Sequence, residues 1–129
     1  MKKSLQSITQ TLVPPNQELP NVSVSGIKLN SEHVTKGDLF IAICGTKVDG
    51  HDFIHDAIES GASAIISNGR DVGELTVPQI KVANPRRAAS IVAAEYYGHP
   101  TQNLTVVGIT GTNGKTTTAS IIHSIFLDA

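Results

Sequence analysis

A glycine-rich loop, Gly108 to Thr118, constrains this chain more than any other stretch; it reads Gly-Ile-Thr-Gly-Thr-Asn-Gly-Lys-Thr-Thr-Thr. An apolar, β-favouring run from Leu104 to Ile109 precedes it, and apolar residues recur at helical spacing from Ala119 to Leu127. The loop is therefore expected to join a strand to the N-terminus of a helix. Free backbone N–H groups and the positive end of the helix dipole meet there, and glycines let an anion approach the backbone. The sequence predicts a site for nucleotide phosphates.

Two side chains of this loop suit ATP. Lys115 supplies a mobile positive charge for the terminal phosphates, and the Thr116 hydroxyl is placed to bind Mg²⁺. The strict phosphate-loop pattern requires a glycine where this chain has Ile109, so a glycine-rich turn with an exposed lysine is the alternative interpretation. The flanking strand and helix favour ATP and Mg²⁺ as ligands.

Composition excludes several classes of protein. The composition, 40% hydrophobic and 16% charged, is that of a globular protein. The length of 129 residues is enough for one good hydrophobic core, or for one domain and part of another. Ten basic and eleven acidic residues, with few aromatic side chains, argue against nucleic acid as a partner. One cysteine excludes an intramolecular disulfide, and no apolar run is long enough to span a membrane. We expect a cytoplasmic protein.

Strands and helices alternate along the chain, which predicts an α/β fold. We expect a small N-terminal domain with a mixed sheet flanked by helices, then the first strand, phosphate loop and helix of a parallel-sheet ATP-binding domain. Residues 99–103 are the best linker, and because the sequence stops one helix after the loop, we expect an N-terminal piece of a larger enzyme. The expected elements are helices over 2–13, 51–61 and 85–98, and strands over 22–29 (with a bulge at Gly26), 39–44, 62–67 and 77–82, the last at a sheet edge or beginning at Gln79.

Other polar residues have competing interpretations. His51, His55 and Glu59 share one helix face and could ligate a metal, but a solvated polar face explains the same spacing. Cys44 follows an apolar strand and is expected to be a small buried hydrophobe and not a nucleophile. The pair Arg86-Arg87 should face solvent in the first turn of its helix, with a phosphate contact as the weaker alternative.

Four stretches resemble the Mur ligases. The family's own ATP loop reads Thr-Gly-Thr-Asn-Gly-Lys-Thr, as residues 110–116 do here. Residues 30–42 resemble the family's Asp-Ser-Arg-x-Val-x-Pro-Gly-Asp-Leu-Phe-x-Ala, and residues 45–53 resemble its Gly-x-x-x-Asp-Gly-His-Asp-Phe. The lead-in Tyr-Gly-His-Pro at 97–100 is similar to the MurE branch, with the MurF branch as the second possibility.

The resemblance implies an ATP-dependent ligase of peptidoglycan biosynthesis. Such an enzyme joins UDP-N-acetylmuramoyl-L-alanyl-D-glutamate to a diamino acid, lysine or diaminopimelate, through an acyl phosphate, and its protein groups mainly position reactants and neutralise charge. Residues 1–100 would be a UDP-sugar-binding domain, and residues 101–129 the beginning of the ATP-binding domain.

The resemblance also assigns site residues. Lys115 would be catalytic, by stabilising the transferring phosphoryl group, and Thr116 would hold Mg²⁺. Core packing is the alternative role for the apolar Leu29 and Val48. The expected ATP-binding residues are Gly111, Thr112, Asn113, Gly114, Lys115, Thr116 and Thr117. The expected UDP-sugar-binding residues are Leu29, Ser31, Thr46, Lys47 and Val48.

One departure from the family pattern bears on the UDP site. Asn30-Ser31-Glu32 replaces Asp-Ser-Arg, which exchanges a cation for an anion. A unit charge about 4 Å away changes an interaction by roughly 4 kcal/mol at an effective dielectric of about 20, so Glu32 should point away or be neutralised if UDP binds. A non-catalytic nucleotide- or UDP-sugar-binding module remains an alternative, and a generic phosphate-loop NTPase would leave residues 30–53 unexplained. We expect these 129 residues not to ligate by themselves, because the acceptor site and most of the ATP pocket would lie elsewhere.

Overall fold

A four-stranded parallel sheet forms the centre of the computed structural model, which describes residues 2–99. Its strands follow one another in chain order, β3-β4-β5-β6. A separate antiparallel pair joins β1 to β2. The strands are β1 Lys3–Ser4, β2 Ser23–Val24, β3 Ile27–Lys28, β4 Leu39–Ile41, β5 Ala64–Ser67 and β6 Gln79–Lys81.

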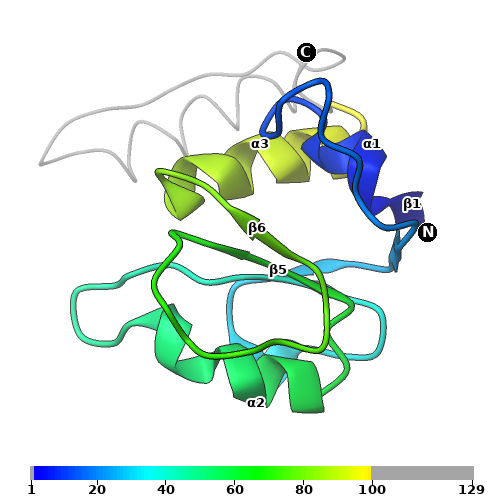
Figure 1. Cartoon of the computed structure of the whole chain (residues 1–129). Coiled ribbons are helices and arrows are strands. Elements are labelled where there is room, and N and C mark those ends of the chain that lie inside the picture. The colour runs from blue at the N-terminus through cyan, green and yellow to red at the C-terminus, as the bar shows by residue number, and fades with distance from the viewer. Residues whose placement is uncertain (1, 100–129) are drawn as a thin grey trace, which may run out of the picture. The chain divides into compact units, whose positions relative to one another are not determined.

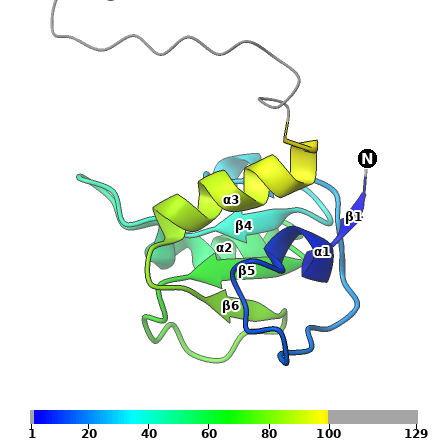
Figure 2. The ribbon, with the colours of Figure 1, turned by 90° about the horizontal axis from the view of Figure 1, so that it is seen from above.

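Helices cover both faces of the parallel sheet, as Figure 1 shows. Helices α1 (Leu5–Thr9) and α3 (Pro85–Tyr97) contact each other on one face, and Figure 2 shows them lying over the strands. The other face carries α2 (Ile54–Glu59) and the short 3₁₀ helix η1 (Ser31–His33). A second 3₁₀ turn, η2 (Gly50–Phe53), runs directly into α2. The result is a three-layer arrangement.

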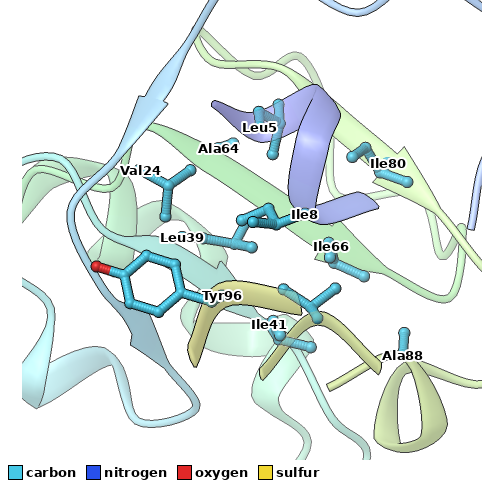
Figure 3. Packing of buried hydrophobic residues seen from close by; sticks show 11 residues of the cluster. Leu5, Ile8, Val24, Leu39, Ile41, Ala64, Ile66, Ile80, Ala88 and Tyr96 are labelled. Atoms are coloured by element: carbon cyan, nitrogen blue, oxygen red, sulfur yellow. The ribbon is translucent and has the colours of Figure 1, made fainter. Parts of the chain in front are cut away.

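Side-chain alternation along β4 explains these layers. Leu39 and Ile41 belong to the core under α1 and α3, whereas Phe40 belongs to the core under α2, because successive residues of a strand point to opposite faces. All three are buried, as the central position of β4 in the sheet requires. Figure 3 shows the first core, in which Leu5 and Ile8 of α1 meet the sheet.

The α/β class is confirmed. Antiparallel pairing is found in the β1-β2 sheet and parallel pairing in the β3-β4-β5-β6 sheet. The expected edge strand beginning at Gln79 is confirmed, as is the start of α3, where the Asn84 side chain accepts from the Arg87 N–H at 3.1 Å. The helix before residue 61 ends as predicted, with Gly61 at φ +114°. The phosphate loop predicted at 108–118 lies outside the described residues.

Two local predictions were wrong. The stretch over 22–29 is not one bulged strand: β2 and β3 belong to different sheets, and the chain changes sheet around Gly26, where an added Cβ would lie 2.7 Å from Asp38 Oδ1. The first helix covers only Leu5–Thr9: before it, Lys3–Ser4 pairs with β2, and after it residues 10–13 form a turn and a bend. Alternating apolar residues cannot show which sheet a strand joins.

Candidate ligand-binding site beside β3 and β4

A cavity of about 540 Å³ is lined by β4, by the segments that follow β3 and β4, and by residues of η2, of α2 and of its C-terminal end. In parallel α/β sheets, ligands bind where the chain leaves the carboxyl ends of the strands. The apolar lining is Leu29, Phe40, Ile43, Val48 and Phe53, and the remaining lining residues are Asn30, Ser31, Glu32, Gly50, Asp56 and Ser60. The cavity therefore combines an apolar wall with a polar rim, as small-molecule sites usually do.

Leu29, Ser31 and Val48, all expected to bind the UDP-sugar, line this one cavity, although Val48 lies far along the chain from the other two. Leu29 is 54% exposed and Val48 is 61% exposed, so the core-packing alternative for these two residues is wrong. Thr46 and Lys47 are exposed on the same loop as Val48 but do not line the cavity.

The loop that carries Val48 is a tight hairpin, here called the 43–50 hairpin. Cys44 and Asp49 face each other in an antiparallel bridge, and the Gly50 N–H donates to the Ile43 carbonyl at 2.9 Å. A Cβ at Gly50 would lie 2.9 Å from both N and O of Ile43, so only glycine allows this close approach. The hairpin presents Thr46 and Lys47 beside the cavity.

His51 anchors the base of this hairpin and is only 2% exposed. Its Nδ1 lies 2.6 Å from Asp49 Oδ1, and its Nε2 accepts from the backbone N–H of Asn68 at 3.0 Å. Because Nε2 is the acceptor, Nδ1 carries the proton and donates to Asp49. The backbone N–H of His51 also donates to Asp49 Oδ1, and this bond is the main cause that lowers the pKa of Asp49 below its usual value.

This environment changes the interpretation of the histidine pair. The solvated-face interpretation is wrong for His51, which is buried and uses both ring nitrogens. His55 is exposed, and its Nε2 lies 2.7 Å from the Val72 carbonyl oxygen. Across residues 2–99, no three His, Cys, Asp or Glu side chains are grouped to hold a metal ion. Because it is buried and both of its ring nitrogens are bonded within the domain, His51 has a structural role in the described chain.

Arg70, which the sequence analysis did not single out, contacts the base of the 43–50 hairpin. Its Nη1 donates to Asp49 Oδ2 at 2.9 Å, and its Nη2 donates to Asp52 Oδ1 at 2.8 Å. These two carboxylates, Asp52 foremost, raise the pKa of Arg70. Arg70 lies 21 residues from Asp49 in a polar loop without periodicity, so no sequence pattern links the two residues.

The rim of the cavity is acidic. Glu32 and Asp56 both line it, no basic side chain does, and within residues 2–99 Glu32 forms no ion pair. The expectation that Glu32 points away or is neutralised is therefore not met in the described chain. Asn30 keeps a local role, because its Oδ1 accepts from the Glu32 N–H at 3.0 Å and caps η1.

The remaining sequence candidates have simple outcomes. Cys44 is exposed, which corrects the expected burial, because β4 ends at Ile41 and Cys44 already belongs to the hairpin. Arg86 and Arg87 are exposed, as predicted. In the described part of the chain, none of the helices has the length and apolar character needed to cross a bilayer.

Fold and cavity together define an α/β domain with a candidate ligand-binding cavity beside its parallel strands, and comparison with known proteins identifies the family. Residues 23–97 match the family description "Mur ligase family, catalytic domain". A UDP-N-acetylmuramoyl-L-alanyl-D-glutamate–2,6-diaminopimelate ligase from Aquifex aeolicus is 51% identical over 106 residues, which are 82% of this chain and 22% of that protein. The protein of the same name from Oceanobacillus iheyensis is 38% identical over 126 residues, 98% of this chain and 25% of that protein. The chain belongs to the Mur ligase family, and it spans about a quarter of the length of these relatives.

Solved structures agree with this assignment. A UDP-N-acetylmuramoylalanyl-D-glutamyl-2,6-diaminopimelate–D-alanyl-D-alanyl ligase from Acinetobacter baumannii has a TM-score of 0.73 at 27% identity, covering 99% of this chain and 28% of its own. The MurF ligase from Thermotoga maritima, solved in complex with ADP, has a TM-score of 0.56 at 40% identity, covering 71% of this chain and 21% of its own. The family resemblance seen in the sequence is thereby confirmed.

Proposed function

We propose that this chain is the UDP-sugar-binding part of an ATP-dependent ligase of peptidoglycan biosynthesis. The ligase adds diaminopimelate to UDP-N-acetylmuramoyl-L-alanyl-D-glutamate, the reaction named in its Aquifex and Oceanobacillus relatives. The observation that carries the proposal is the convergence of Leu29, Ser31 and Val48 on one cavity in a member of this family. The 51% identity to a diaminopimelate ligase favours this acceptor over the MurF-type reaction.

The lining of the cavity indicates how the UDP-sugar would lie. The flat faces of the uracil ring can pack against the apolar wall formed by Leu29, Phe40 and Val48, while its polar ring edge faces the polar rim. The carboxylates of Glu32 and Asp56 can accept hydrogen bonds from the ribose hydroxyls but would repel a diphosphate. In this proposal the nucleoside enters the cavity, and the diphosphate lies outside it, towards Lys47 on the 43–50 hairpin.

The ATP half of the proposal depends on the sequence of the phosphate loop. Residues 111–117 would bind ATP, Lys115 would face the terminal phosphates and Thr116 would bind Mg²⁺. We place the domain boundary near residue 100 and the protein in the cytoplasm. ATP would supply the phosphoryl group that activates the substrate carboxylate.

Titration of the chain with uridine and with UDP tests this placement of the substrate. Glu32→Gln removes a charge but keeps an acceptor, so UDP should bind about threefold to fivefold more tightly, equivalent to roughly 1 kcal/mol near water-exposed charges, while uridine affinity stays the same. The gain should shrink at high salt. The matched control is Glu18→Gln, an exposed glutamate in the loop after α1. If Glu32→Gln changes uridine and UDP binding equally, or neither, the bound diphosphate is out of range of the Glu32 charge at the cavity rim, and this placement of the UDP-sugar is wrong.

A further inference from the structure

A continuous set of polar contacts joins the 43–50 hairpin to the loop after β5. Asp49, at the hairpin base, uses one carboxylate oxygen for His51 and the other for Arg70. His51 in turn receives a hydrogen bond from the Asn68 N–H, and Arg70 reaches Asp52 with its second nitrogen. The position of Asp49 is therefore fixed from two directions.

The outer part of the hairpin has little other support. Its backbone is closed by the Gly45 N–H to Val48 carbonyl bond at 2.9 Å, and the side chains of Thr46 and Lys47 form no hydrogen bond within residues 2–99. These are also the residues that the proposed function assigns to the UDP-sugar. A loop that is ordered before binding loses less conformational entropy when the ligand binds.

Arg70 lies outside the hydrophobic core, unlike the buried His51 in the same set of polar contacts. Its side chain is 47% exposed, and exposed ion pairs of this kind add little to the stability of a fold. Its planar guanidinium nevertheless spans two carboxylates, Asp49 in the hairpin and Asp52 in η2, and holds them at a fixed separation. This two-pronged guanidinium contact is better suited to positioning the two carboxylates than to stabilising the fold.

We propose that Arg70 is a positioning residue for UDP-sugar binding, which acts through Asp49 and Asp52 to hold the 43–50 hairpin in its binding conformation. The inference rests on the proposed function, because it assigns a purpose to the hairpin of that same site. Arg70 does not line the cavity and acts only through its carboxylate partners.

Calorimetric titration of the chain with UDP-N-acetylmuramoyl-L-alanyl-D-glutamate tests the proposal. Arg70→Ala should raise the Kd about tenfold, the size expected when a preorganised loop is released. Arg70→Lys keeps the charge without the fork and should recover only part of this loss. Arg87→Ala, an exposed arginine on α3, is the matched control and should leave the Kd unchanged. Urea unfolding of each variant should show nearly unchanged midpoints, because a structural role would shift midpoint and affinity together.

A second readout separates this proposal from the proposed function. Amide hydrogen exchange at Gly45 and Gly50 reports closure of the hairpin without any ligand, since both N–H groups bond across it. Exchange should be slow in the wild-type chain and at least several-fold faster in Arg70→Ala. If the folded wild-type chain binds no UDP-sugar, the proposed function fails, and exchange alone decides whether Arg70 holds the hairpin. Unchanged Kd, or unchanged exchange at both glycines in folded Arg70→Ala, would overturn the positioning role.

Discussion

Replacing His51 by alanine should destabilise the described domain far more than any other histidine replacement. The side chain is almost fully buried, donates to Asp49 at 2.6 Å and accepts from Asn68 N at 3.0 Å. The bond to a charged carboxylate contributes about 2 kcal/mol and the bond from the amide about 1 kcal/mol. The space left by the ring adds about 1 kcal/mol or more. We expect His51→Ala to lower the free energy of unfolding by about 4 kcal/mol.

His55→Ala is the control for this prediction. His55 lies four residues further along, is exposed, and makes a single contact to the Val72 carbonyl, so its loss should cost about 1 kcal/mol or less. Urea unfolding at pH 7, followed by circular dichroism with m-values compared, measures both variants. Adding a chelator should leave the wild-type midpoint unchanged. A loss for His51→Ala no larger than for His55→Ala, or a chelator-sensitive midpoint, would refute the structural role of His51.

Three further predictions concern stability. Tyr96→Phe removes a 2.8 Å hydrogen bond to the Ser25 carbonyl and should cost about 1 kcal/mol in urea unfolding; a neutral result would mean that the bond contributes nothing. The pKa of Asp49 is lowered in the folded state, so its stabilisation is present above about pH 4 and is lost as the pH falls through the folded pKa. The stability difference between wild type and Asp49→Asn should therefore shrink on acidification, and a difference that grows would contradict this sign. Gly50→Ala places a Cβ 2.9 Å from Ile43 backbone atoms and should cost about 1–3 kcal/mol, a cost that an unchanged urea midpoint would rule out.

Much of the fold follows from local patterns. The start of α3 was predictable because Asn84 caps it and proline occupies its first position. The edge position of β6 was predictable because Pro78 cannot donate to a neighbouring strand. The division of residues 22–29 between two sheets was not predictable, because partner choice is decided by contacts such as Lys3 with Val24 that lie far apart in the sequence.

The site was predicted in part. The family resemblance predicted Leu29, Ser31 and Val48 as UDP-sugar-binding residues; the structure brings them to one cavity, and their contact with a ligand stays a prediction. Thr46 and Lys47 lie on the hairpin outside that cavity, and whether they touch ligand stays a prediction. Arg70 was missed because its role arises only where the loop after β5 meets the hairpin. Spacing suggested a polar face for His51, whereas tertiary contacts bury it.

The most direct test of the central claim is a calorimetric titration of the chain with UDP-N-acetylmuramoyl-L-alanyl-D-glutamate, comparing wild type with Ser31→Ala and Ser90→Ala. Ser31 lines the cavity, whereas Ser90 is exposed on α3, on the opposite face of the sheet from α2. The account predicts saturable binding to wild type, about fivefold weaker binding to Ser31→Ala through loss of one hydrogen bond, and no change for Ser90→Ala. Absence of binding to the folded chain, or equal effects of the two substitutions, would contradict the assignment of this cavity to the UDP-sugar.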